Sequence, residues 1–173
     1  NKKDENYFEN SANSFKVKFS NRVFENEPLI KFSFKDLNIS IIPVNINEDV
    51  KIIKNKNSIF YKNIWNGVDL LYEVRNSKLK EYIIINSPEF PLNIEFLYQI
   101  DGKYEINKKE QGNFEIIGVG GYKILIPELY CFDSSKEMKL FEPKINIDTS
   151  QNPIKISLII DLNQINQENF IFP

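Results

Sequence analysis

The sequence predicts an all-β chain, either an antiparallel β-sandwich or a partly closed barrel. Apolar side chains alternate with polar ones in short runs, and a period of two is typical of strands with one buried face. These runs recur about every ten residues, with Gly, Asn, Asp or Pro turn signals between them. Helical patterns are scarce. We therefore expect about ten or more short antiparallel strands.

The first half of the chain carries five such runs before the longest pattern begins. Residues 15–19 (FKVKF) alternate cleanly. The turn signals Asn-Glu-Pro at 26–28 and Lys-Asp-Leu-Asn at 35–38 separate the runs that follow. The expected strands are residues 15–19, 29–34, 38–43, 50–53 and 59–61.

Residues 68–85 (VDLLYEVRNSKLKEYIII) form the clearest pattern in the chain. Two alternating runs flank the polar turn at 75–78, which predicts a β-hairpin. Its loop length pairs Val74 with Leu79, Glu73 with Lys80, and Tyr72 with Glu81. Between Glu73 and Lys80 we expect a cross-strand ion pair on the outer face, contributing about 0.2–1 kcal/mol.

Glu81 is the odd member of the apolar row of this hairpin. A buried carboxylate without a partner is costly. We therefore expect Glu81 to accept hydrogen bonds from a tyrosine hydroxyl or from backbone N–H groups.

The second half repeats the short runs. Gly118 to Gly121 lie between two of them with no helix following, which favours a tight turn or bulge over a phosphate-binding loop. Cys131, the single cysteine, is interpreted as a small buried hydrophobe. The expected strands are residues 92–99, 113–117, 122–126, 138–141 and 154–161, with one helical turn at 164–169.

Length and composition indicate one domain. The chain has 173 residues and is 42% hydrophobic, enough for a sizeable core. We expect a flexible polar lead-in at residues 1–14 and a single sandwich domain at residues 15–173. The chain begins without Met and ends abruptly at Pro173, so we expect a segment of a longer protein.

Charge and residue usage argue against several function classes. The formal net charge is -2, which gives no electrostatic case for nucleic acid. No apolar run approaches the roughly 18 residues of a membrane helix, so we expect no membrane insertion. Histidine is absent and there is one cysteine, which removes the usual general base and any cysteine-based metal cage. We expect no catalytic residue, cofactor or metal.

Residues 59–85 resemble a segment of large exported bacterial wall-associated and RHS (YD-repeat) proteins. The pattern is a Tyr and Asn pair, a Gly-Val-Asp-Leu-x-Tyr strand, a short turn and a Lys-Glu-x-Ile strand. Residues 126–133 and 154–173 are also similar to that family. The matching positions of the central pattern are Tyr61, Asn63, Gly67, Val68, Asp69, Leu70, Tyr72, Lys80, Glu81, Ile83 and Ile85.

The resemblance implies a non-catalytic β module of a large surface or toxin-delivery protein, located outside the cell or at the cell wall. Its partners would be neighbouring domains of the parent protein. In this interpretation the matched residues, among them Tyr61, Asn63 and Gly67, form a structural motif.

A second interpretation is a carbohydrate-binding module that attaches the parent protein to cell-wall or host glycans. Trp65 and Tyr61 are the candidate ligand-binding residues, since aromatic rings can stack on sugars. The competing interpretation, which we favour, is that Trp65 closes one end of the sandwich as a core aromatic. Trp65→Ala would distinguish the two in a glycan-binding assay.

The acidic residues allow a third interpretation, an enzyme, which we disfavour. Glycoside hydrolysis needs two carboxyl groups about 5–10 Å apart in a cleft. Asp69 and Glu73 share a face but lie about 13 Å apart along a strand. The carboxylates considered were Asp69, Glu73, Glu81 and Asp133.

Two further features stay open at this point. Asp101-Gly102 and other acidic turns could bind Ca²⁺, although no D-x-D-x-D-G loop occurs. A Lys–Asn isopeptide crosslink would be revealed by an intact mass lower by about 17 Da per bond, the mass of the ammonia released.

Overall fold

The computed structural model describes residues 7–9, 14–87, 89–91, 93–109, 113–127, 131–132, 140–141, 144–150 and 152–159. Within these residues there is no helix, and every strand pairs with its neighbours in antiparallel fashion. The predicted all-β class is therefore confirmed.

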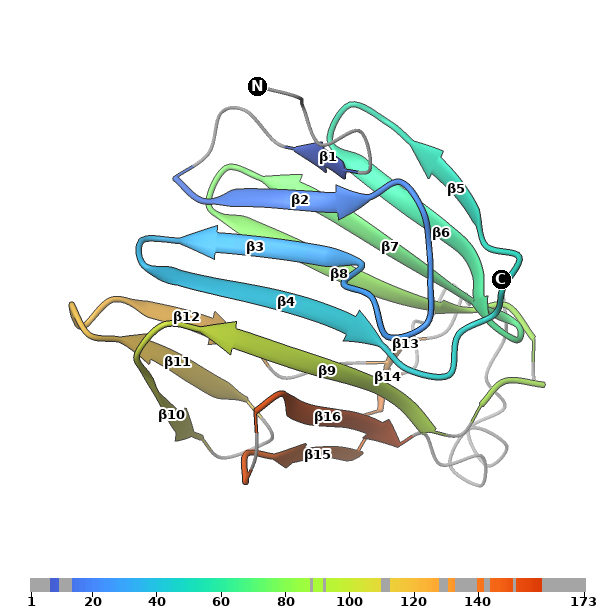
Figure 1. The fold of residues 1–173 in the computed structure, drawn as a ribbon. Coiled ribbons are helices and arrows are strands. Elements are labelled where there is room, and N and C mark those ends of the chain that lie inside the picture. The colour runs from blue at the N-terminus through green and yellow to red at the C-terminus, as the bar shows by residue number, and fades with distance from the viewer. Residues whose placement is uncertain are drawn as a thin grey trace.

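The front layer in Figure 1 is a seven-stranded sheet of order β1-β2-β3-β4-β9-β16-β15. The first four strands form a meander, and β9 then returns beside β4 after the chain has built the second layer. Its strands are β1 (Tyr7–Glu9), β2 (Lys16–Ser20), β3 (Ile30–Phe34), β4 (Leu37–Pro43), β9 (Asn93–Asp101), β15 (Lys144–Asp148) and β16 (Ile154–Ile159).

The layer behind it is a four-stranded meander of order β5-β6-β7-β8. A three-stranded sheet of order β10-β11-β12 and a short β13-β14 pair complete the described strands. Their bounds are β5 (Lys51–Lys54), β6 (Ser58–Trp65), β7 (Val68–Arg75), β8 (Lys78–Ile85), β10 (Tyr104–Lys108), β11 (Phe114–Gly118), β12 (Lys123–Ile126), β13 (Cys131–Phe132) and β14 (Leu140–Phe141).

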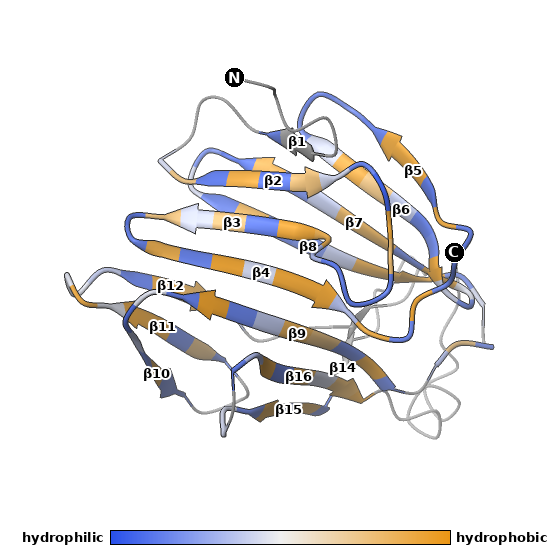
Figure 2. Ribbon diagram, viewed as in Figure 1, coloured by the Kyte–Doolittle hydropathy of each residue, from blue (hydrophilic) through white to orange (hydrophobic). Residues whose placement is uncertain are grey.

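One hydrophobic core fills the space between the two large sheets. The alternation of hydrophobic and polar residues, clear along β2, β4 and β9 in Figure 2, directs every second side chain inward. Phe19 of β2 meets Tyr72 of β7, with ring centroids 6.0 Å apart. Trp65 of β6 meets Phe96 of β9 edge to face at 5.4 Å. These contacts join front and back layers into a sandwich.

The described strands form no closed barrel, so the sandwich alternative holds. Within the expected lead-in, Tyr7–Glu9 form β1 and pair with β2, which differs from a wholly flexible segment. Three further elements were not predicted: β10, β13 and β15. The expected helical turn at 164–169 lies outside the described residues.

Candidate functional site

The residues of the predicted motif all lie on β6, β7 and β8 and on the turns that join them. The hairpin has the predicted register: Val74 pairs with Leu79, Glu73 with Lys80, and Tyr72 with Glu81. Arg75 also pairs with Lys78, so the loop itself is the two residues 76–77. The even period of both strands and the short loop leave only one register that buries the apolar row.

Tyr72 and Glu81 form a polar contact on the inner side of the sheet. The Tyr72 hydroxyl donates to Glu81 Oε2 at 2.5 Å, which confirms the expected tyrosine donor. Burial raises the pKa of Glu81, and the bond from Tyr72 only partly opposes this. Burial, then the Glu81 charge, raises the pKa of Tyr72 well above its usual value. Tyr72 is therefore protonated at neutral pH and acts as the donor to the Glu81 carboxyl group.

Glu73 lies on the opposite side of the same hairpin. The Arg75 guanidinium donates to Glu73 Oε2 at 2.9 Å, and the Tyr82 hydroxyl donates to the same oxygen at 3.3 Å. The bond from Arg75 lowers the pKa of Glu73. The salt bridge of Glu73 is with Arg75 and not with Lys80, so the predicted partner is wrong at salt-bridge distance, although the Lys80 charge also contributes to lowering the pKa of Glu73. Lys80 Nζ lies over the Tyr82 ring, 5.8 Å from its centroid. Arg75, two residues further along the same strand, binds the Glu73 carboxylate instead.

Asn63 forms a β-bulge between β6 and β7. The register shifts between Tyr61 and Trp65, and Asn63 has a φ of 56°, in the left-handed region. The Asn63 N–H donates to Asp69 Oδ1 at 2.7 Å, and the Asn47 side chain donates to the Asn63 carbonyl at 2.8 Å. Asp69 is 8% exposed. Its carboxylate therefore holds the bulge rather than facing a substrate.

Gly67 occupies the turn between β6 and β7 with a φ of 66°. A Cβ at this position would lie 3.0 Å from the Glu89 carbonyl oxygen and 3.1 Å from Ser87 Cβ. Both the backbone conformation and the close approach of Ser87 and Glu89 require glycine here.

Tyr61 and Trp65, the expected ligand-binding residues, are buried at 0% and 3% exposure. The Tyr61 hydroxyl donates to the Ser20 carbonyl at 2.9 Å, and Trp65 Nε1 donates to the Val44 carbonyl at 2.8 Å. Each side chain fastens the back layer to the front layer. The rings therefore offer no exposed platform for a sugar, and the interpretation of Trp65 as a core aromatic is the one that fits.

The glycine-rich segment 118–121 is a tight turn, as predicted. Gly121 N–H donates to the Gly118 carbonyl at 2.9 Å, and Gly121 has a φ of 74°. The Tyr122 ring covers Gly118 so closely that a Cβ there would lie 2.2 Å from the ring. Aromatic cover of a strand glycine is a packing device.

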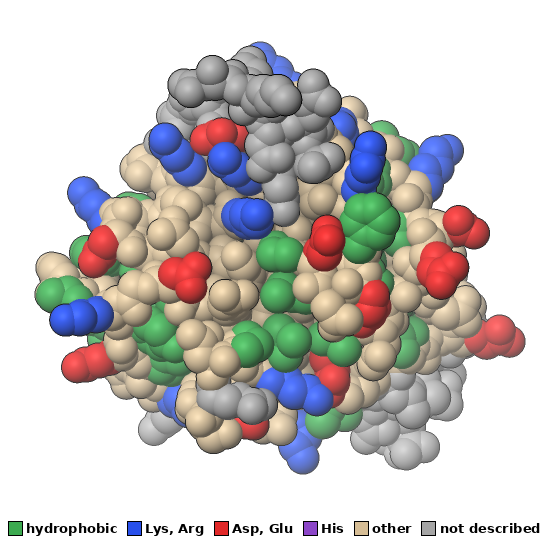
Figure 3. All heavy atoms as spheres, in the orientation of Figure 1, with side chains coloured by type: hydrophobic (Ala, Val, Ile, Leu, Met, Phe, Trp, Pro, Cys, Tyr) green, Lys and Arg blue, Asp and Glu red, His purple; other side chains and the backbone are tan. Residues whose placement is uncertain are grey.

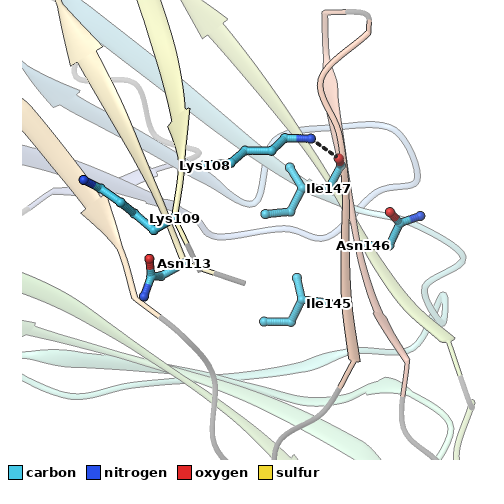
Figure 4. A pocket seen from close by; sticks show the side chains of 6 residues that line it. All are labelled: Lys108, Lys109, Asn113, Ile145, Asn146 and Ile147. Atoms are coloured by element: carbon cyan, nitrogen blue, oxygen red, sulfur yellow. Dashed lines mark hydrogen bonds between the residues drawn. The ribbon is translucent and has the colours of Figure 1, made fainter. Parts of the chain in front are cut away.

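A shallow cleft of about 230 Å³ lies between β10 and β15 and is smaller than most ligand sites. Figure 4 shows Ile145 and Ile147 pointing into it while Asn146 points away. Lys108 Nζ donates to the Ile147 carbonyl at 3.0 Å, and Lys109 pairs with Glu115 at 3.5 Å. Both lysines therefore already have partners within the protein.

Among the described residues, no group of three His, Cys, Asp or Glu side chains could hold a metal ion. No helix in that part of the chain is long and apolar enough to cross a membrane. Asp101 ends β9 and Gly102 has a φ of 117°, so this dipeptide serves as a turn. Cys131 lies in β13, its side chain is not described, and Asp133 is outside the described residues.

Comparison with protein-family models, with curated proteins and with solved structures found no match. The resemblance to exported wall-associated and RHS proteins therefore stays a prediction based on the residues of the central motif.

Proposed function

We propose that this chain is a non-catalytic structural domain of a large exported bacterial surface or RHS-like protein, where it packs against and spaces neighbouring domains. One observation supports the proposal above all. The chemically conspicuous residues of the central motif, from Tyr61 to Glu81, are engaged in internal bonds that hold turns, bulges and layers together.

The placement of the carboxylates supports the non-catalytic part of the proposal. Asp69 and Glu81 lie on opposite faces of the four-stranded sheet, so they cannot act on one substrate. Asp69 and Glu73 share the outer face, but four residues of strand separate them by about 13 Å. Each of these three groups already accepts a hydrogen bond. Paired carboxylates for glycoside hydrolysis need a shared cleft.

The structure suits a spacer mechanically. Phe19 with Tyr72 and Trp65 with Phe96 join the two layers through a single core. A domain with one core transmits load and orientation as a unit. Location outside the cell is part of the proposal and follows from the family resemblance alone.

The experiment is to read the gene outward on both sides and then test the neighbours. We expect an export signal upstream and YD repeats downstream. The adjacent segments, produced separately, should bind this chain in calorimetry or raise its melting temperature. A reading frame for an intracellular enzyme whose activity is lost on Asp69→Asn or Glu81→Gln, with folding intact, would refute the proposal.

A further inference from the structure

The outer face of the four-stranded sheet carries an apolar row that crosses all four strands. The register pairs Ile53 with Phe60, Phe60 with Leu71, and Leu71 with Tyr82, one residue per strand. All four side chains are partly exposed. We call these four residues the outer row.

Basic side chains surround the outer row. Lys62 Nζ lies 5.4 Å from the centroid of the Phe60 ring, and Lys80 Nζ lies 5.8 Å from that of the Tyr82 ring. None of the four lysines on this face forms a salt bridge with a described residue. The basic residues at outward positions are Lys51, Lys62, Arg75, Lys78 and Lys80.

The acidic residues of this face are already engaged. Asp69 is buried and accepts a hydrogen bond from the Asn63 N–H. Glu73 accepts hydrogen bonds from Arg75 and Tyr82. The face is therefore cationic although the chain as a whole has a net charge of -2. Charge complementarity calls for an anionic partner.

The outer face of the seven-stranded sheet is different. Figure 3, which views that side, shows basic and acidic side chains interspersed. Lys155 pairs with Glu95 at 2.7 Å, and Lys18 pairs with Glu9 at 3.9 Å. The excess of basic side chains around the outer row is therefore specific to the outer face of the four-stranded sheet.

We propose that the outer row and its lysines form a binding face for an acidic polysaccharide. Sugar rings have apolar C–H faces that pack on aromatic rings, and their carboxylates would pair with Lys62 and Lys80. Phe60 and Tyr82 lie two strands apart, or about 9–10 Å at the usual strand spacing. A chain of sugars laid across the strands would meet both rings.

Sheet geometry favours a polysaccharide over an acidic peptide. The backbone groups of β6 and β7 are paired within the sheet, so the face offers side chains alone. An extended peptide needs partners for its own N–H and C=O groups and finds them at a sheet edge. A sugar chain needs apolar contact and side-chain donors, both of which this face provides.

The lysines over the rings are compatible with such a ligand. An exposed cation–π contact contributes only about 0.5–1 kcal/mol. A ligand carboxylate can therefore draw Lys62 or Lys80 off its ring and leave the ring face for the sugar. This site goes beyond the structural role proposed above, and neither depends on the other.

The test is calorimetric titration of the full chain with polygalacturonate at low and high salt. Its carboxyl-reduced, neutral form is the matched ligand control, and poly-glutamate represents an acidic peptide. The variant Lys62→Gln/Lys80→Gln is compared with Lys16→Gln/Lys144→Gln, which removes the same charge from exposed positions of the other sheet. Phe60→Ala/Tyr82→Ala tests the rings. Melting temperatures confirm that each variant folds.

We expect polygalacturonate to bind more weakly as salt rises, and the neutral polymer to bind far less. The Lys62/Lys80 variant should lose about tenfold in affinity, the Phe60/Tyr82 variant at least as much, and the Lys16/Lys144 variant almost nothing. Absence of binding at low salt, or equal losses in the two lysine variants, would overturn the proposal. Poly-glutamate binding that depends equally on Phe60 and Tyr82 would assign the face to a peptide instead.

Discussion

The two faces of the four-stranded sheet use the same kinds of residue in opposite ways. On the inner face, Tyr61, Tyr72 and Trp65 are buried, and each donates a hydrogen bond inside the protein. On the outer face, Phe60 and Tyr82 are partly exposed beneath lysines. The presence of a second layer, rather than residue type, decides whether an aromatic side chain supports the fold or is available to a ligand.

The carboxylates of the hairpin show the same contrast. Burial raises the pKa of Glu81 on the inner face, whereas the Arg75 guanidinium lowers the pKa of Glu73 on the outer face. One hairpin thus holds two glutamates with opposite shifts, because one has lost water and the other has gained a cation.

The largest expected effect is on the free energy of unfolding when one aromatic side chain is truncated on each face. Trp65→Ala should lower the free energy of unfolding by about 3–5 kcal/mol, because Trp65 is buried against Phe96. Phe60→Ala, a matched aromatic truncation on the outer face, should cost about 1 kcal/mol or less. Urea unfolding measures both, and Trp65→Phe serves if the alanine variant does not fold. Equal costs would remove the contrast between the faces.

The second effect compares a packed turn with an open one. Gly67→Ala should cost more than about 2 kcal/mol, since the left-handed backbone alone costs roughly 1–2 kcal/mol and the new Cβ would crowd the Glu89 carbonyl. Gly121→Ala also has a positive φ, but no atom lies within 4 Å of the added Cβ. Its cost should be the backbone part only. A urea midpoint for Gly121→Ala at or below that of Gly67→Ala would argue against the close approach of Ser87 and Glu89 to Gly67.

The third effect concerns one hydroxyl on each face. Tyr61→Phe leaves the Ser20 carbonyl without its buried donor and should cost about 1–2 kcal/mol. Tyr82→Phe removes a longer bond on the outer face and should leave the urea midpoint nearly unchanged. The prediction fails if the two substitutions have the same effect.

The smallest effect is a difference in the sign of two pH dependences. The folded-state pKa of Glu81 is raised, so its contribution to stability is full below the unfolded pKa and falls as pH rises through the folded pKa. Glu81→Gln should therefore gain in melting temperature over wild type between acidic and neutral pH. The lowered pKa of Glu73 acts in the other direction: its contribution is present above the unfolded pKa and is lost as pH falls through the folded pKa.

Glu73→Gln should accordingly melt slightly below wild type at neutral pH, and the difference should vanish in acid. Thermal scans of wild type and both variants from about pH 3 to pH 8 cover both windows. The difference in melting temperature between variant and wild type should rise with pH for Glu81→Gln and fall with pH for Glu73→Gln. If both differences changed with pH in the same direction, the opposite pKa shifts of Glu81 and Glu73 would be contradicted.

Local patterns predicted the hairpin well because its register depends on near neighbours. The two-residue period and the short loop were enough to pair Tyr72 with Glu81, and the cost of burying a carboxylate was enough to expect a tyrosine donor. The strands β10 (YEINK) and β15 (KINID) were missed because each has only two apolar side chains among lysine, asparagine and acidic residues.

Long-range features were beyond the reach of the sequence. The bulge at Asn63 depends on Asp69 and Asn47, which come from other segments. The sequence favoured Trp65 as a core aromatic over a ligand-binding residue, but it could not predict that Phe96 of the front layer would be its partner. The outer row exists only once four strands are set in register, so Phe60 and Tyr82 carried no signal of their own. Packing between distant segments decides these cases.

Native-state hydrogen exchange tests the central claim most directly, namely that inward side chains of the back layer fasten both sheets into one core. The slowest-exchanging backbone amides of β7 in the back layer and of β4 in the front layer should have the same free energy of opening. That value should equal the free energy of global unfolding. If β7 opened at a clearly lower free energy while β4 stayed protected, the two layers would be separate units and the claim would be wrong.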